Sequence, residues 1–187
     1  MRCSWAERDE IRAYHDQEWG VPLHDDKRLF ELLTLEGAQA GLSWLTVLRR
    51  RPGYVRAFKR FNPKLIAAFT PADVDRLLEN TDIIRHRGKI ESTINNAGAV
   101  LELQRSGSSL EELLWSFVDN VPLQRDWTVD PHIPASTREA ALMSKELKIR
   151  GFRFVGPTTC YSLMQAAGLV NDHHPECFRY AEVRSLR

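Results

Sequence analysis

Two pairs of potential metal ligands lie at opposite ends of the chain. Cys3 and His15 are close to its start, and His173 and Cys177 are close to its end, separated by three residues. Two thiolates and two imidazoles form the tetrahedral set that suits structural Zn²⁺ and leaves no coordination position for a substrate. One ion held by both pairs would close a loop of ~160 residues, a constraint worth about 4–5 kcal/mol of chain entropy. We therefore expect the metal to be a structural clip and the chemistry to lie elsewhere.

The spacing of these residues alone leaves alternatives open. The i, i+4 pair His173 and Cys177 fits one face of a helical turn, but neither pair has the Cys-x-x-Cys spacing of a zinc finger. Cys3 and Cys177 are also consistent with ordinary thiols, and the histidines with caps of surface turns. His174 is an alternative ligand in place of His173.

Composition predicts a soluble globular protein. The 187 residues are 43% hydrophobic and 27% charged, a mixture that can bury a core as one domain or as two small lobes. No apolar run approaches the ~20 residues of a membrane span, and the chain does not open with the apolar stretch of a signal peptide. Three cysteines, an odd number, argue against a disulfide framework. We expect a cytoplasmic protein without a membrane partner.

Basic residues are clustered although the net charge is only +1. A single cluster is usually a solvated helix face. Because the net charge is near zero, the acidic residues must lie mainly outside these basic clusters. The clusters could therefore form one basic face that binds phosphates. The clusters occupy residues 49–51, 56–60, 85–89 and 148–153.

Helical periodicity dominates the chain, and the predicted fold class is all-α with many short helices. Thr70 to Asp73 reads as a capping box with a proline in the first turn. Pro52 and Gly53 are expected to interrupt one helix, and residues 121–134 to form an irregular loop. No internal repeat and no alternating strand pattern of useful length is present. The expected helical segments are residues 26–35, 44–61, 70–78, 89–103, 110–118, 135–150 and 158–169.

Residues 152–159 lie between two of these segments and contain Gly156 followed by Pro157, Thr158 and Thr159. A tight glycine-containing hairpin that opens a helix presents free N–H groups and a positive dipole end to a phosphate. This segment resembles the hairpin of helix-hairpin-helix DNA-binding proteins, although Phe154 stands at the first glycine position. An ordinary connection between two helices is the alternative.

Residues 35–44 place Glu36 at the end of an apolar helix, on or near its buried face. A carboxylate there needs a partner or a cationic ligand, because burying it alone is costly. Gly37 and Gly41 are expected to bracket a flexible turn, and Trp44 supplies a large flat face. Together these residues suit recognition of a planar ring that is cationic or bears an amine. In the alternative, Glu36 caps a neighbouring backbone and Trp44 is a residue of the hydrophobic core. Residues Trp5, Tyr14 and Trp19 are also consistent with core positions.

Several long segments resemble the DNA-3-methyladenine glycosylase I family in matching order. They are Cys-Ser-Trp at 3–5, Ala-Tyr-His-Asp-Gln-Glu-Trp-Gly-Val-Pro at 13–22, residues 35–44, Ile-Ile-Arg-His-Arg-Gly-Lys-Ile at 83–90, Trp-Ser-Phe at 115–117, and residues 151–173. Asp82 departs from the family by standing where a glycine is common, but aspartate tolerates left-handed backbone. Residues after Cys177 lie outside the likeness.

The resemblance implies a two-lobed, all-α helix-hairpin-helix glycosylase fold over residues 1–187, with the base pocket between the lobes and a structural Zn²⁺ site joining the termini. It implies a monomeric enzyme acting on double-stranded alkylated DNA. Glu36 falls on the carboxylate that recognises the methylated adenine and carries the catalytic role. The other implied site residues are Tyr14, Trp44, Trp5 and Trp19 around the base, Gly41, Leu42, Gly156, Thr158 and Thr159 toward DNA, and Cys3, His15, His173 and Cys177 on zinc.

Methylation at N3 makes adenine cationic and a good leaving group, so flipping the nucleotide and holding the base is sufficient catalysis. Asp172 is the nearest candidate for an aspartate that orients the attacking water. Because it is next to an expected zinc ligand, we do not predict a catalytic role for it. No lysine stands out as a Schiff-base nucleophile, so strand cleavage is not expected. A non-catalytic damage-binding module is the alternative. The sequence contains none of the motifs that zinc deaminases and zinc hydrolases use to bind their catalytic metal, which argues against these two enzyme classes.

Overall fold

The structure, a computed structural model, describes residues 1–128 and 132–186, and their regular secondary structure is helical apart from one pair of short strands. The all-α prediction is confirmed at this level. The elements are η1 (Ser4–Ala6), α1 (Asp9–Gln17), α2 (Asp26–Gln39), α3 (Trp44–Ala57), η2 (Lys59–Phe61), α4 (Pro63–Ala67), α5 (Pro71–Glu79), α6 (Arg87–Arg105), α7 (Leu110–Trp115), η3 (Ser116–Val118), β1 (Leu123–Gln124), α8 (Arg138–Ile149), α9 (Pro157–Ala166), β2 (Val170–Asn171) and α10 (Phe178–Arg184).

Side-chain caps set where several of these helices begin. The Asp25 carboxylate accepts a hydrogen bond from the Arg28 N–H at the start of α2, at 2.8 Å. Ser43 caps α3 in the same way. The predicted capping box at Thr70 and Asp73 is confirmed, since each side chain accepts from the other residue's backbone N–H.

The predicted break at Pro52 and Gly53 is wrong, because α3 runs through both residues. Pro52 removes one backbone donor from the helix, but α3 is anchored by its buried residues Leu45, Val47 and Tyr54. Gly53 is needed for packing, since a Cβ there would lie 2.2 Å from the Asp82 carbonyl oxygen. Gly37 is likewise inside α2, so the turn begins only after Gln39.

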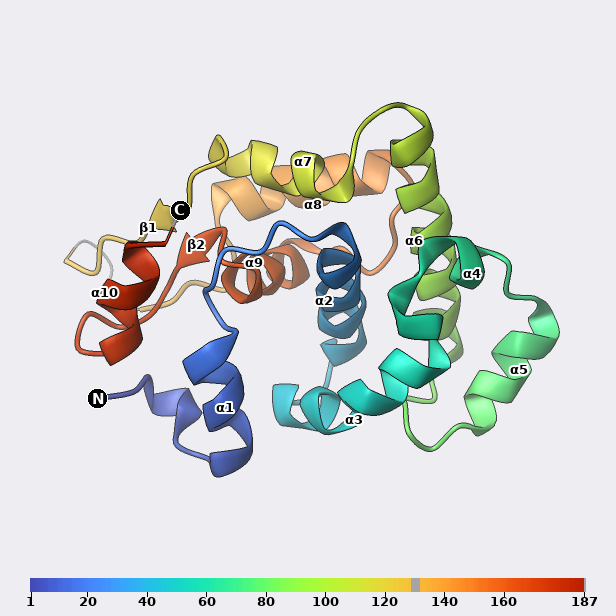
Figure 1. The fold of residues 1–187 in the computed structure, drawn as a ribbon, viewed down its shortest axis with the longest axis horizontal. Coiled ribbons are helices and arrows are strands. Elements are labelled where there is room, and N and C mark those ends of the chain that lie inside the picture. The colour runs from blue at the N-terminus through green and yellow to red at the C-terminus, as the bar shows by residue number, and fades with distance from the viewer. Residues whose placement is uncertain (129–131, 187) are drawn as a thin grey trace.

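Helix α2 lies at the centre of the molecule, with α9 beside it (Figure 1). Helices α4, α5 and α6 lie on one side, and α1, α10 and the two strands lie on the other (Figure 1). Strand β1 pairs with β2 in parallel, with Leu123 opposite Val170. The predicted loop at 121–134 therefore holds one short strand, and its residues 129–131 are outside the described part of the chain.

The two ends of the chain lie on the same side as α10 (Figure 1). A backbone hydrogen bond of 3.1 Å from the Phe178 N–H to the Met1 carbonyl joins the first residue to the start of α10. Within the described residues, none of the helices has both the length and the apolar character that crossing a membrane requires.

Candidate functional site

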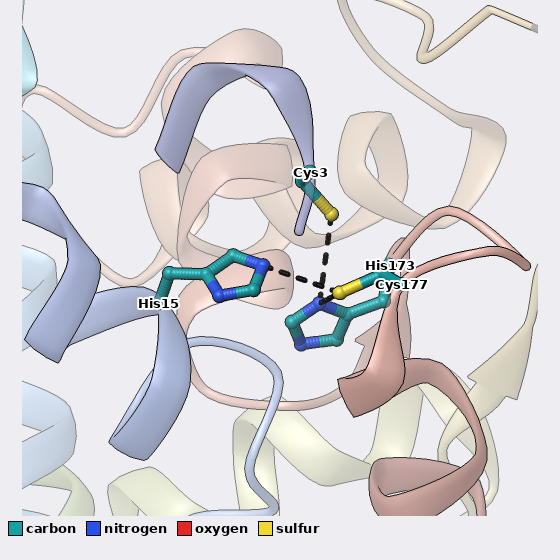
Figure 2. A group of neighbouring side chains, drawn as sticks. All are labelled: Cys3, His15, His173 and Cys177. Carbon is teal, nitrogen blue, oxygen red and sulfur yellow. Dashed lines mark hydrogen bonds between the residues drawn. The ribbon is translucent and has the colours of Figure 1, made fainter. Parts of the chain in front are cut away.

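Four buried side chains from the two ends of the chain converge at one point. Cys3, His15, His173 and Cys177 place their ligand atoms within 4.8 Å of one another (Figure 2). Cys3 precedes η1 and His15 lies in α1, while His173 and Cys177 lie in the turn before α10. The last pair therefore does not use the helical turn that its spacing would fit, and the irregular segment before α10 brings the two side chains together.

The separations in this cluster match those around a tetrahedral zinc ion. Bonds of ~2.3 Å to sulfur and ~2.0 Å to nitrogen set S···N distances of about 3.6 Å. Cys177 Sγ lies 3.5 Å from His15 Nε2 and 3.7 Å from His173 Nδ1. Cys3 Sγ lies 3.7 Å from His173 Nδ1. The donor set and its spacing therefore fit the metal.

Hydrogen bonds to the outer ring nitrogens leave the inner ones free to coordinate. His173 Nε2–H donates to the Trp19 carbonyl at 3.0 Å, and His15 Nδ1–H donates to the Asp16 carboxylate at 2.8 Å. Arg2 donates to the same Asp16 carboxylate at 2.9 Å. Such outer partners fix the imidazole tautomer at metal sites.

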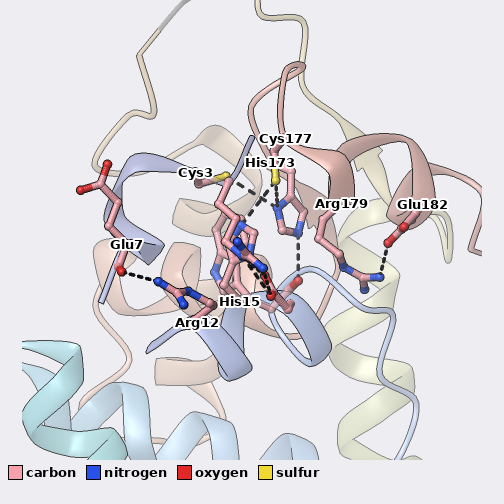
Figure 3. Close-up of polar contacts among 11 residues, drawn as sticks. Cys3, Glu7, Arg12, His15, His173, Cys177, Arg179 and Glu182 are labelled. Atoms are coloured by element: carbon pink, nitrogen blue, oxygen red, sulfur yellow. Dashed lines mark hydrogen bonds and ion pairs between the residues drawn. The ribbon is translucent and has the colours of Figure 1, made fainter. Parts of the chain in front are cut away.

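Hydrogen bonds around the cluster hold the chain segments that carry its four side chains in place (Figure 3). Arg12 donates to the Glu7 carbonyl at 3.1 Å, and Arg179 donates to the Glu182 carboxylate at 2.7 Å. Burial raises the pKa of Cys3 to about 12 and lowers the pKa of His173 to about 4 in the metal-free protein. A cation between them would reverse the penalty on the thiolates.

The choice between the adjacent histidines is decided by their positions. His173 is fully buried in the cluster. His174 is exposed, and its ring packs on Trp127 with ring centroids 5.1 Å apart. His173 is therefore the ligand candidate.

A cavity of about 310 Å³ opens beside the cluster, between α1, α2, α3 and α9. Trp5 contributes to its wall and also packs edge-on against His15, with ring centroids 5.2 Å apart. The rings of Tyr14 and Trp44 lie 5.3 Å apart, and those of Trp5 and Trp19 lie 4.8 Å apart. The cavity is lined by Trp5, Tyr14, Trp19, Glu36, Gln39, Trp44, Ile133, Ser162 and Gln165.

Glu36 is the carboxyl group in this aromatic cavity. Its side chain is buried, and no hydrogen bond to its carboxylate occurs among residues 1–128 and 132–186. Burial raises the pKa of Glu36 to about 8. The pKa of Tyr14 is also well above its usual value, first because of burial and then because of the Glu36 charge. The carboxyl group therefore does not cap a neighbouring backbone within the described residues, whereas Trp44 packs against the hydrophobic core as well as lining the cavity.

A second compartment, of about 190 Å³, adjoins the first. It shares Glu36, Gln39 and Ser162 with the aromatic cavity. Its remaining walls are the loop of Ala40, Gly41 and Leu42, and the first turn of α9 with Thr158 and Thr159. Gly41 has a φ of +79°, which favours glycine, and the Leu42 side chain next to it is 40% exposed.

In the connection from α8 to α9, Phe154 stands at the first glycine position of the expected hairpin and takes a conformation that favours glycine. That residue adopts a φ of +57°, the left-handed conformation expected of glycine. Its side chain packs where Gly37 and Gly88 allow a close approach, since a Cβ on Gly37 would lie 3.3 Å from the Phe154 Cβ. Gly156 begins α9 without a side-chain cap, so the first N–H groups of α9 remain available.

The basic residues of the clusters at 85–89 and 148–153 differ in their surroundings. Arg85 and Arg153 are exposed, while Arg87 pairs with Asp75 at 2.7 Å. Lys89 is buried, and its Nζ donates to the carbonyls of Ala38 and Ala40, each at 2.8 Å. Lys89 is therefore not placed to reach a phosphate.

Asp172 lies behind the aromatic cavity. Its Oδ2 accepts hydrogen bonds from the Tyr161 hydroxyl and from Gln165 Nε2, the latter at 2.8 Å. Gln165 lines the cavity, whereas Asp172 lines neither compartment.

Gln39, Ser162, Gln165 and Ile133 line the cavity but were not predicted from the sequence. Three of them could have been found by helical spacing. Gln39 lies three residues after Glu36, and a polar row runs along the buried helix α9 at Thr158, Ser162 and Gln165. Ile133 lies in an irregular segment, which offers no such signal.

Comparison with known proteins gives consistent matches over nearly the whole chain. The profile of the methyladenine glycosylase family matches residues 5–180. DNA-3-methyladenine glycosylase 1 of Escherichia coli (strain K12) is 50% identical over 180 residues, which are 96% of each chain. A crystal structure of a 3-methyladenine DNA glycosylase I superposes with a TM-score of 0.92 at 51% identity, covering 95% of this chain and 98% of that one. A tyrosine-to-phenylalanine variant of a 3-methyladenine DNA glycosylase I, in complex with 3-methyladenine, has a TM-score of 0.90 at 37% identity, covering 95% and 96%.

Proposed function

Because the chain belongs to the methyladenine glycosylase family, we propose that it excises 3-methyladenine from alkylated double-stranded DNA by hydrolysing the N-glycosidic bond. The observation that carries this proposal is the buried carboxyl group of Glu36, which lies in an aromatic cavity and has no hydrogen-bond partner among the described residues. A buried carboxylate in such a cavity favours a cationic ring with an amine. We also propose the two-lobed helix-hairpin-helix arrangement, with the cavity between the lobes.

The aromatic cavity receives the flipped base. Trp44 and Tyr14 pack on the ring, and Trp5 and Trp19 complete the walls. The ionised Glu36 accepts a hydrogen bond from the exocyclic amine and stabilises the cationic base before it departs as a neutral one. The lost positive charge passes to the sugar as an oxocarbenium-like centre, to which water adds.

The second compartment receives the sugar of the same nucleotide. The residues shared by both compartments, Glu36, Gln39 and Ser162, then lie beside the bond that breaks. Leu42 enters the base stack where the nucleotide has left it. Gly156 and the N–H groups of Thr158 and Thr159 bind the DNA phosphate at the start of α9.

Zinc in the cluster of Cys3, His15, His173 and Cys177 would hold the chain ends together. When bound, the ion supplies stability rather than chemistry, because four protein ligands complete its coordination. No lysine lines either compartment in the part of the chain that the structure describes. This supports a monofunctional enzyme that leaves the strand intact, and we propose that it acts as a monomer.

The test is base release from methylated duplex DNA. The wild-type protein should release 3-methyladenine, detected by chromatography, and the strand should break only after alkaline treatment. Binding of the DNA without base release would favour the damage-binding module instead. Strand breakage before alkali would contradict the monofunctional mechanism.

A further inference from the structure

Behind the loop that carries Leu42 lies a buried lysine that the proposed mechanism does not use. Lys89 is only 9% exposed. Its ammonium group donates to the Ala38 and Ala40 carbonyls, each at 2.8 Å. These carbonyls belong to the last turn of α2 and to the residue that ends it.

The location of this cation is unfavourable for its own helix. Lys89 is in the first turn of α6, where the helix dipole disfavours positive charge. No carboxylate pairs with it within the described ranges, and burial lowers its pKa. The compensation comes from the carbonyls at the negative end of α2, which a cation stabilises. The lysine therefore supports α2 rather than α6.

The supported backbone leads directly into the exposed loop. Ala40 ends α2, Gly41 follows with a φ of +79°, and the Leu42 N–H donates to the Gln39 carbonyl at 2.6 Å. These short contacts and the two bonds from Lys89 restrain the start of the loop, and the Ser43 cap of α3 holds its end. Phe154 of the α8–α9 connection packs against Gly37 and Gly88 at the same junction.

We propose that Lys89 is a positioning residue that fixes the Ala40–Gly41 backbone so that Leu42 points at the DNA base stack. The proposal rests on the proposed function, because it concerns how the flipped state in DNA is held. Lys89 contacts neither the base nor the sugar compartment. Its loss should therefore weaken flipping and leave binding of the free base intact.

The experiment compares Lys89→Met, which keeps the aliphatic stem, with Lys27→Met at the exposed opposite end of α2. Each variant is titrated with free 3-methyladenine to measure its affinity for the base. The rate at which it releases the base from methylated duplex DNA is measured in single-turnover reactions. We expect Lys89→Met to slow release about tenfold to a hundredfold, the effect of losing a charge-assisted hydrogen bond. Its affinity for the free base should stay within about twofold, and Lys27→Met should match the wild type in both assays.

A double-mutant cycle separates positioning from general stability. In a Leu42→Ala background, Lys89→Met should slow release less than about threefold, because the residue being positioned is gone. An unchanged release rate in Lys89→Met, or its full effect in the Leu42→Ala background, would overturn the proposal. If Lys89→Met does not fold, the same double-mutant cycle is measured with Lys89→Gln, whose side-chain amide retains one hydrogen-bond donor group. A wild-type protein that releases no base would instead refute the proposed function.

Discussion

Replacing Glu36 by Gln should separate binding from stability, because the carboxyl group forms no hydrogen bond with any residue that the structure describes. The amide keeps the size of the side chain but removes the charge and presents donors where the base amine needs an acceptor. One charge-assisted hydrogen bond is worth roughly 1.5–3 kcal/mol, or about tenfold to a hundredfold in affinity. We expect the variant to bind free 3-methyladenine weaker by this factor.

The pKa of Glu36 gives the sign of the pH dependence. Burial raises the pKa from 4.5 to about 8, so the folded protein holds this proton more tightly than the unfolded chain. Wild-type stability is therefore lost as pH rises from the ordinary value through about 8, by at most roughly 5 kcal/mol. Glu36→Gln carries no such proton, so it should be as stable as the wild type at pH 5 and more stable at pH 9.

The assays are titration with the free base followed by tryptophan fluorescence, and urea unfolding at both pH values. The wild-type kcat/KM for base release should also rise with pH and level off above about 8, whereas the Glu36→Gln profile should lack this step. Glu102→Gln removes a carboxylate that is 67% exposed on α6 and serves as the control. Wild-type affinity in Glu36→Gln, or lower stability of this variant at pH 9, would refute the role assigned to the carboxyl group.

Three further expectations follow from other parts of the structure. Elemental analysis should find one zinc per chain. The Cys177→Ala variant should lose the zinc and unfold at a lower temperature, while its folded fraction keeps near wild-type specific activity. Full stability with no activity would indicate a catalytic metal. Affinity for duplex DNA should fall steeply with salt if Gly156 and the start of α9 bind phosphate as proposed, and an affinity indifferent to ionic strength would contradict this. Gly53→Ala should lower the free energy of unfolding by about 3 kcal/mol in urea titrations, because its Cβ would lie 2.2 Å from the Asp82 carbonyl oxygen; a neutral effect would show that this backbone can move.

Local features of the chain could be predicted from the sequence. The capping box at Thr70, the apolar face of α2 and the all-α class depend on residues a few positions apart. The types of the four residues in the Cys and His cluster also predict which metal would suit it. The resemblance supplied the aromatic residues of the cavity, which spacing alone left as either core or pocket.

Contacts between distant segments were decided only by the tertiary structure. Pro52 stays inside α3 because a packed helix can tolerate the loss of one donor, and His173 rather than His174 turns toward Cys3 from 170 residues away. Lys89 reaches the Ala38 carbonyl across 51 residues, and a basic cluster in the sequence cannot show which of its members is buried. The pKa of Glu36 likewise depends on what surrounds it in space, because desolvation is set by the packing of α1, α2, α3 and α9 around one carboxyl group.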